Sequence, residues 1–399
     1  MTTTLADLYR HLHAHPETAF QEHETAALAA KRVRELGYEV TEGVGVTGVV
    51  AMLRNGPGPT VLLRADMDAL PMAEATGLPY ASTRPDAMHA CGHDMHVTWL
   101  IGALEALSRT REEWSGTIMA VFQPAEENGG GAQVMVDDGL FDRFGTPDVA
   151  LGQHVVPLAA GTVGYRSGPV MAASDALSIK LFGRGGHGSR PEATVDPVVM
   201  AAATVMRLQT VVSREVSPLE TAVVTVGAIH AGTVTNIIPA EAELKLTVRT
   251  FSGPVRERVI AAIERIVRAE AIASGAPQLP EFVRIGGYPV LVNDEPAMQR
   301  TMAGIRAAIG AGNVADQPLI MGSEDFGTFG KAAGVPSCFW FVGGGDPEKV
   351  AAAKAAGRVD EDLPTNHSPF FAPVIEPTLG TGVRTMVAAA RAWLSDLGR

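Results

Sequence analysis

Short apolar segments that end in acidic residues or histidine recur in this sequence, and they restrict the possible folds more than any other feature. Thr117–Val121 is apolar and rich in β-branched residues, which predicts a buried strand. Pro124 ends this strand, and Glu126 and Glu127 follow side by side before a run of glycines. Adjacent carboxylates are costly to bury unless they are paired or bind a metal ion. The pair is therefore either a solvated acidic turn or a site where one glutamate binds a cation and the other transfers a proton.

Two further predicted strands end in the same way. The strand at 60–65 is followed by Asp66 and Asp68, and the strand at 148–153 ends at His154. Helices are predicted between at least some of these strands, which indicates an α/β fold with a mostly parallel sheet. In such sheets the functional site lies outside the carboxyl ends of the strands. We therefore expect these side chains to gather at one edge of the sheet.

The turn before the next predicted helix adds two candidate ligands. Cys91 and His93 are two residues apart around Gly92, so both side chains can face one cation. An isolated cysteine is more commonly a buried apolar residue, which is the alternative here.

A helix predicted at 5–15 carries three more histidines, His11, His13 and His15. A spacing of two on a helix directs side chains apart. We therefore expect these three to be surface or capping residues and not metal ligands.

The pattern changes near residue 175, where a smaller unit begins. Strands are predicted at 176–182, 222–229, 242–250 and 281–285, with helices at 198–212 and 254–274. This β-α-β-β-α-β order is typical of a ferredoxin-like α+β unit. Alternating helices and strands resume from Pro289. We therefore expect an inserted domain at 175–287 within a discontinuous catalytic, metal-binding domain made of 1–174 and 288–399.

Gly183–Gly188 matches the glycine pattern of dinucleotide-binding loops, but its context excludes that function. Such a loop opens directly into a helix whose N-terminus holds the phosphates. Here Pro191 intervenes, and the next helix is predicted to begin only at Asp196 and Pro197. No acidic residue lies about 20 positions further on to bind a ribose. A nucleotide-dependent oxidoreductase is therefore not expected.

Size and composition narrow the remaining classes of protein. A chain of 399 residues is expected to form two domains. Its net charge of −12, without a dominant basic patch, argues against nucleic-acid binding. No apolar run is long enough to span a bilayer, so no membrane association is expected. The chain has only two cysteines, and its N-terminus lacks the pattern of a secretory signal, so we expect a cytoplasmic protein.

Seven short motifs occur in order along nearly the whole chain. They are Cys91-Gly92-His93-Asp94, Gln123-Pro124-Ala125-Glu126-Glu127, Gly152-Gln153-His154, Gly185-Gly186-His187-Gly188-Ser189, Thr235-Asn236-Ile237-Ile238-Pro239, Ser323-Glu324-Asp325-Phe326 and His367. Each motif is weak alone, but together they resemble the M20 family of metallopeptidases, specifically its amidohydrolase branch. That branch contains hippurate hydrolases, N-acyl-amino-acid amidohydrolases and auxin-conjugate hydrolases.

The resemblance implies roles for particular residues. The ligands of two divalent cations per subunit would be Cys91, His93, Glu127, His154 and His367. Glu126 would be the general base that activates a water between the cations, and Asp68 would orient a residue of the metal site. The substrate would be bound by His187, Asn236 and Arg249, and in relatives the histidine comes from the partner subunit.

The resemblance also implies the cofactors and the assembly. A site of nitrogen, sulfur and oxygen ligands suits zinc, and manganese, cobalt or nickel are alternatives. A thiolate ligand favours zinc, while the resemblance favours manganese as much. In this family the inserted domain carries the dimer contact, so we expect a homodimer or a higher homo-oligomer.

The chain departs from the wider M20 family at three positions. It has Asp66-x-Asp68 in place of His-x-Asp, Cys91 in place of a bridging acid, and His154 in place of an acidic ligand. The amidohydrolase branch shares these changes, so we follow that branch. Whether Asp66 contacts a cation, and whether Cys91 bridges the two, stays open.

The reaction implied is hydrolysis of an N-acyl amino acid, with an N-acetyl, N-benzoyl or similar group, to a carboxylic acid and a free amino acid. A dipeptidase and an N-acyl- or succinyl-diaminopimelate deacylase are alternatives within the family. A non-catalytic, metal-dependent binding protein is an alternative from another class. Loss of Glu126 or of a ligand would mark such a protein, and neither is lost here.

Overall fold

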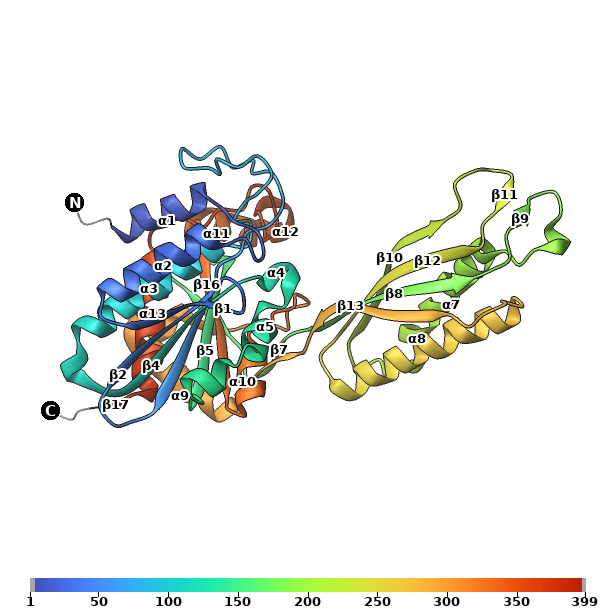
Figure 1. The fold of residues 1–399 in the computed structure, drawn as a ribbon. Coiled ribbons are helices and arrows are strands. Elements are labelled where there is room, and N and C mark those ends of the chain that lie inside the picture. Colours follow the sequence, from blue (N-terminus) through green and yellow to red (C-terminus); the bar gives the residue numbers. More distant parts are fainter. Residues whose placement is uncertain (1–3, 397–399) are drawn as a thin grey trace. The chain divides into compact units, whose positions relative to one another are not determined.

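The structure is a computed structural model that describes residues 4–396, and its chain divides into two compact units (Figure 1). The first unit comprises Met1–Val170, Val292–Pro318 and Asp325–Arg399, and the second comprises Met171–Leu291 and Leu319–Glu324. Strands β7 (Gly168–Met171) and β14 (Leu291–Asn293) pair with each other where the chain passes between the units. Each unit is described separately below.

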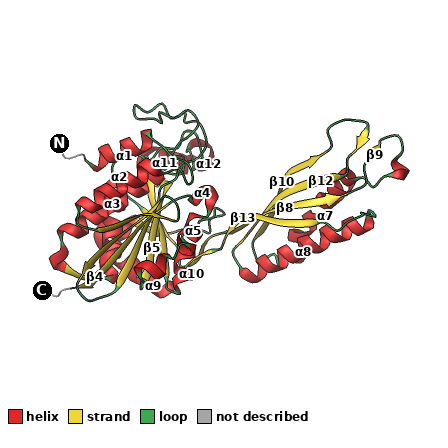
Figure 2. Cartoon of the chain, in the orientation of Figure 1, coloured by secondary structure: helices red, strands yellow, loops and turns green. Residues whose placement is uncertain are grey.

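A mixed sheet forms the centre of the first unit (Figure 2). In spatial order its strands are β1 (Glu39–Val44), β2 (Gly48–Asn55), β4 (Trp114–Gln123), β3 (Thr60–Asp66), β5 (Val149–Ala159), β16 (Ser337–Gly345), β6 (Val163–Tyr165) and β15 (Val314–Asp316), and β17 (Ser395–Asp396) pairs with β4. The central strands β4, β3, β5 and β16 are parallel to one another. Their carboxyl ends therefore meet at one edge of the sheet.

Long helices cover one face of this sheet. They are α1 (Leu5–Ala14), α2 (His23–Glu35), α3 (His93–Arg109), α9 (Glu295–Ile309) and α13 (Thr378–Trp393). Helix α3 packs against α1, α2 and α13, and α13 packs against α9. Alternate residues of the strands, such as Leu63, Ala120 and Leu151, form one buried core with these helices.

The intervening strand residues, such as Leu62 and Met119, are equally buried, which requires a second covering layer. Helices α5 (Gly131–Asp137) and α10 (Gly327–Ala333) pack together and against this sheet. The remaining short helices of the unit are α4 (Glu126–Gly129), α6 (Leu140–Phe144), α11 (Pro347–Ala356), α12 (Val359–Asp362) and the 3₁₀ turns Arg111–Glu113 and Ala311–Asn313. A sheet buried on both faces explains why its strands are continuously apolar in sequence.

The second unit is a small α+β fold. Its antiparallel sheet has the order β10 (Ala222–Ala231), β12 (Glu241–Thr250), β8 (Ala173–Phe182) and β13 (Glu281–Tyr288), and the helices α7 (Pro197–Glu215) and α8 (Gly253–Ala273) pack on each other. A ferredoxin-like β-α-β-β-α-β insertion in an α/β chain is thus confirmed. Two short strands, β9 (Gly186–His187) and β11 (Ile237–Ile238), form a separate two-stranded pair. The 3₁₀ turn Pro191–Ala193 lies between β9 and α7 in the sequence.

The glycine segment 183–188 does not open into a helix. Its last residues form β9, and α7 begins only at Pro197, with Asp196 accepting hydrogen bonds from the amides of Val198 and Val199. A dinucleotide loop would lead directly into a helix N-terminus, so this geometry agrees with the prediction that residues 183–188 do not form one. Within residues 4–396, no helix combines the length and the apolar character needed to cross a membrane.

Two local predictions were wrong. Strand β5 does not end at His154 but continues to Ala159, because its residues pair with β16 beyond that point. His13 is not on the surface but fully buried, since it lies one turn after Tyr9 on the inward face of α1. His15, by contrast, is the capping residue expected, and its Nδ1 donates to the carbonyl of His11 at 2.7 Å.

Candidate metal centre

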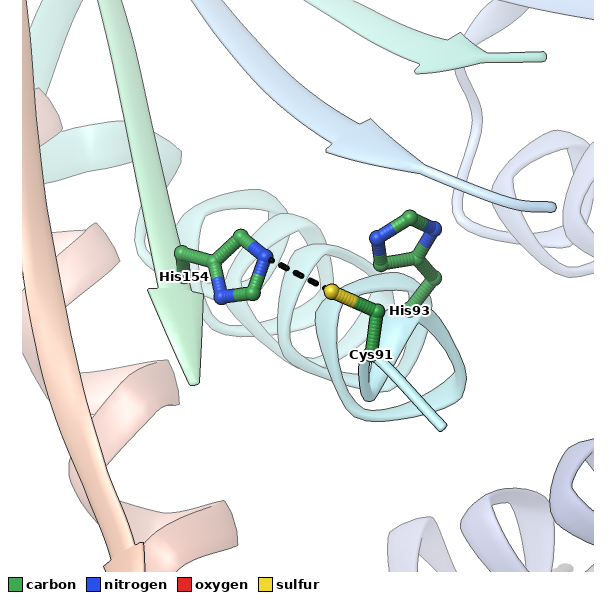
Figure 3. Close-up of side chains that lie close together, drawn as sticks. All are labelled: Cys91, His93 and His154. Atoms are coloured by element: carbon green, nitrogen blue, oxygen red, sulfur yellow. Dashed lines mark hydrogen bonds between the residues drawn. The ribbon is translucent and has the colours of Figure 1, made fainter. Parts of the chain in front are cut away.

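Cys91, His93 and His154 form the centre of the candidate site (Figure 3). Cys91 lies in the turn before α3, His93 is the first residue of that helix, and His154 lies in β5. Gly92 between them has φ +83°, and a Cβ there would lie 2.3 Å from a methyl carbon of Val155. Only glycine fits this turn without strain, so Gly92 allows the cysteine and the histidine to face His154.

His154 presents a lone pair to the thiol. Its Nδ1 donates to the carbonyl of Val155 at 2.8 Å, so Nε2 is unprotonated in the neutral ring and faces Cys91 Sγ at 3.5 Å. Burial, and next the nearby His96, hold the pKa of His154 well below its usual range. A neutral imidazole with a free Nε2 is the form that binds metal ions.

His93 is oriented by a carboxylate. Its Nδ1 lies 3.3 Å from Asp68 Oδ1, which leaves Nε2 directed away from Asp68. Nε2 is buried and has no hydrogen-bond partner among the described residues, although Asp66 Oδ2 lies at 3.5 Å and Glu127 Oε1 at 3.9 Å. A histidine held by a carboxylate on one nitrogen, with its other nitrogen free, is the usual arrangement of a metal-binding imidazole.

The two glutamates lie at the start of α4, directly after β4. Asp68 accepts hydrogen bonds from the backbone amides of Glu126 and Glu127, each at 3.0 Å. The side chain of Glu126 is buried. Glu127 Oε1 is also buried and makes no hydrogen bond within residues 4–396, and it lies 3.2 Å from His367 Nε2.

His367 reaches the cluster from an exposed loop. Its backbone amide donates to the carbonyl of Ala90 at 2.8 Å, and its φ of +69° is uncommon for a residue other than glycine. The preceding Asn366 donates from Nδ2 to the carbonyls of Cys91 at 3.2 Å and Val155 at 3.1 Å. The side chain of Asn366, next to His367, thus bonds the backbone of Cys91 and of the residue that follows His154. Sequence reasoning missed Asn366 because an asparagine next to a histidine carries no pattern of its own.

These donors fit a pair of cations. The five residues that the resemblance implied as ligands fall into two groups that share the cysteine, Cys91–His93–His154 and Cys91–Glu127–His367, and within each the ligand atoms lie within 4.8 Å of one another. Burial, then Glu127 and Glu126, raises the pKa of the Cys91 thiol well above its usual range. Divalent cations would neutralise the same carboxylates and stabilise the thiolate.

Asp66 and His96 lie behind this cluster and form a third group with His93. Asp66 Oδ2 makes an ion pair with Arg64 Nη1 at 2.7 Å, and Oδ1 is bonded to His96 Nδ1 at 2.5 Å. Nε2 of His96 in turn accepts from the amide of Val155 at 2.9 Å. Burial acts to raise the pKa of Asp66, but Arg64 and His93 hold it well below its usual range. Oδ1 thus has a donor partner inside the protein. The buried Oδ2, despite its ion pair with Arg64, makes no hydrogen bond among the described residues and lies 3.5 Å from His93 Nε2.

The three candidate substrate-binding residues lie in the second unit. His187 is exposed, and its Nδ1 accepts from the amide of Ser189 at 3.1 Å, so Nε2 carries the proton in the neutral ring. Asn236 is also exposed and lies beside it, because its carbonyl accepts from the amide of Gly188 and the strands of His187 and Ile237 pair.

Arg249 lies elsewhere in the unit. It is near the far end of β12, eight residues and roughly 27 Å along the strand from Glu241. Nη1 of Arg249 donates to the carbonyl of Met321 at 2.6 Å and to Ser323 Oγ at 3.1 Å. The structure therefore brings His187 and Asn236 together but separates both from Arg249 within one chain.

Comparison with known proteins identifies the family. Residues 62–376 match the model of peptidase family M20/M25/M40. The hippurate hydrolase of Campylobacter jejuni is 41% identical over 325 residues, which cover 80% of this chain and 82% of that protein. An N-acyl-L-amino acid amidohydrolase of Geobacillus stearothermophilus is 41% identical over 302 residues, covering 75% of this chain and 80% of that protein.

A solved structure supports the same assignment. It is a Bacillus subtilis protein described as a dinuclear metal-binding peptidase of the M20 family, with a TM-score of 0.76, 30% identity and coverage of 97% of both chains. The chain belongs to peptidase family M20/M25/M40. It is a metal-dependent hydrolase of amide bonds, in agreement with the resemblance seen in the sequence.

Proposed function

We propose that this enzyme hydrolyses N-acyl amino acids to a carboxylic acid and a free amino acid. The observation that carries the proposal is the cluster of Cys91, His93, Glu127, His154 and His367 beside the buried carboxylate of Glu126. The names of the two 41% identical relatives support an acyl amino acid as substrate. The acyl group, whether acetyl, benzoyl or another, is left to experiment.

The five ligands would hold two divalent cations, for which zinc, manganese, cobalt and nickel are the candidates. When bound, such cations polarise an acyl carbonyl and lower the pKa of a water molecule toward neutrality. Asp68 keeps His93 in the tautomer with its Nε2 lone pair toward the site. Glu126 accepts the proton of the attacking water and then delivers it to the leaving nitrogen, which releases the amino acid.

His187 is proposed to bind the substrate carbonyl. Because Nδ1 accepts a hydrogen bond from Ser189, Nε2–H is the donor available to a developing oxyanion. Such a donor contributes about 2.7–4 kcal/mol of transition-state stabilisation in comparable sites. Asn236, beside it, would contact the same end of the substrate.

Arg249 is proposed to bind the free carboxylate of the substrate through a charge-assisted bond. Its separation of roughly 27 Å from the strand end nearest His187 is too long for both to reach one small substrate from the same chain. If both act, one of them comes from a second subunit, which supports a homodimer as the active form.

A dipeptide is the second candidate substrate, and the peptidase name of the Bacillus subtilis structure favours it. Both substrates present an amide next to a free carboxylate, so the cluster at Cys91 serves either. They differ in the charge of the group on the acyl side, which is an ammonium in a dipeptide and neutral in an acetyl or benzoyl amino acid.

Amino-acid release from N-acetyl, N-benzoyl and indole-acetyl amino acids and from dipeptides tests the proposal. The protein would be stripped of metal and then supplied with Zn²⁺, Mn²⁺, Co²⁺ or Ni²⁺ in parallel. We expect cation-dependent release from acyl amino acids that exceeds release from dipeptides. Faster release from dipeptides would favour the second candidate, and no release with any cation, from protein shown to bind two ions, would contradict both.

A further inference from the structure

Glu22 is a buried carboxylate that no step above uses. It lies just before α2, and its side chain is fully buried. Its Oε1 accepts a hydrogen bond from the amide of Ala125 at 2.8 Å, and its Oε2 accepts one from the hydroxyl of Thr47 at 2.5 Å. A carboxylate is costly to bury without partners, and these two hydrogen bonds offset part of that cost.

The partner of Glu22 directly precedes the two glutamates of the site. Ala125 has φ +50°, in the left-handed region that a residue with a Cβ rarely adopts. This conformation turns the chain from β4 into α4 and thereby sets the direction in which Glu126 leaves the sheet. The amides of Ala125, Glu126 and Glu127 are all taken by carboxylates, the first by Glu22 and the other two by Asp68.

Two buried carboxylates thus hold three successive amides, but they differ in their other contacts. Asp68 also orients His93, so its loss would disturb the ligands as well as the turn. Glu22 contacts the turn on one side and the loop before β2, through Thr47, on the other. Its side chain therefore bonds the turn that carries the glutamates and the loop of Thr47, and neither hydrogen bond goes to a predicted metal ligand.

We propose that Glu22 is a positioning residue for the general base: by holding the amide of Ala125 it fixes the left-handed turn that aims Glu126 into the site. This inference rests on the proposed function of Glu126. Displacements of about 1 Å in a reacting group can lower a rate by about 100-fold. Loss of Glu22 should consequently reduce turnover much more than substrate binding.

The test compares three variants of the full-length, cation-loaded protein. Glu22→Met keeps most of the side-chain volume but removes both acceptors, whereas Glu22→Gln retains an acceptor for Ala125 and can donate to Thr47 Oγ. Glu17→Gln is the matched control, because Glu17 is another buried carboxylate of the same segment and accepts from the amides of Glu24 and Thr25 instead.

We expect Glu22→Met to lower kcat at least tenfold with KM within twofold of wild type and with both cations retained by elemental analysis. Glu22→Gln should recover most of kcat, and Glu17→Gln should leave it within twofold. Unchanged kcat in Glu22→Met would overturn the inference. So would a fall in kcat that follows loss of bound cation, because Glu22 would then support the ligands and not the base.

Hydrogen–deuterium exchange gives a second measurement that does not depend on turnover. The amide of Ala125 should exchange at least tenfold faster in Glu22→Met than in wild type, while Glu17→Gln leaves it unchanged. Equal exchange of this amide in wild type, Glu22→Met and Glu17→Gln would overturn the inference.

A second variant covers the case in which Glu22→Met does not fold. Thr47→Val removes the hydroxyl that donates to Glu22 Oε2, and it should raise the exchange rate of the Ala125 amide and lower kcat about threefold. No change in the exchange rate or in kcat would count against the proposal. Absence of turnover in wild type would contradict the proposed function alone.

Discussion

The buried His13 should make the stability of the first unit depend on pH. His13 Nδ1 lies 2.6 Å from Asp94 Oδ2 and its Nε2 lies 3.2 Å from Glu74 Oε1. Burial acts to lower the pKa of His13, but the hydrogen bonds to Asp94 and Glu74 outweigh it and raise the pKa to about 9, from an ordinary value of 6.5. The folded state therefore binds this proton more tightly than the unfolded chain does.

The sign and size of the effect follow from linkage. A raised pKa contributes stability that is fully present below about pH 6.5 and is lost as the pH rises through about 9. A difference of about 2.5 pKa units corresponds to about 3 kcal/mol of unfolding free energy. Replacing His13 by Gln should remove this pH dependence and also destabilise the protein, because Asp94 and Glu74 lose their partner.

Urea unfolding between pH 6.5 and 9.5, with chelator in every sample, measures this contribution. Tryptophan fluorescence reports on the first unit alone, because all four tryptophans, Trp99, Trp114, Trp340 and Trp393, belong to it. Wild type should lose about 3 kcal/mol more stability over this range than His13→Gln. His11→Gln, at an exposed position of the same helix, should keep the wild-type slope. Equal slopes for wild type and His13→Gln would refute the reasoning.

Three further predictions concern the metal centre. Glu126→Gln should bind the same number of cations by elemental analysis and lower kcat by about 10²–10⁴-fold, because it cannot accept a proton; retained turnover would exclude it as the base. Gly92→Ala should lower both the cation affinity and the unfolding temperature, because a Cβ at φ +83° would lie 2.3 Å from Val155. If calorimetry gives wild-type values for both quantities, the glycine turn is not needed for cation binding or stability. Asn366→Leu should weaken the binding of one cation per chain in isothermal titration calorimetry, because the loop of His367 loses its hydrogen bonds to the carbonyls of Cys91 and Val155. Wild-type affinities for both cations would argue against a role of these hydrogen bonds in cation binding.

Local patterns predicted much of the fold. The apolar runs before Asp66, Glu126 and His154 became β3, β4 and part of β5, because a sheet covered on both faces demands continuous apolar strands. The carboxyl-edge rule then placed the acidic and histidine side chains near one another. The end of β5 was misjudged because Val155 and Val156 are held in the sheet by pairing with β16, which lies almost 190 residues away along the chain.

The parts that the sequence did not predict depend on long-range contacts. His13 is paired with Asp94 across 81 residues, Asn366 with Cys91 across 275, and Ala125 with Glu22 across 103. No periodicity within a segment encodes such pairs, because each is created when separate segments pack. Asp66 is similar in part: Arg64 lies two residues away in the same strand, but His96 becomes its partner only because β3 packs against α3.

A titration of metal-free protein with Co²⁺ tests the central claim most directly. Amino-acid release from the best acyl amino acid and the near-ultraviolet thiolate-to-cobalt absorption would be followed in the same samples. The account predicts that the absorption appears as cation binds at Cys91, that it is absent in Cys91→Ser, and that hydrolysis rises with bound cation. Full hydrolysis by the metal-free protein, or saturating Co²⁺ with no thiolate absorption, would contradict it.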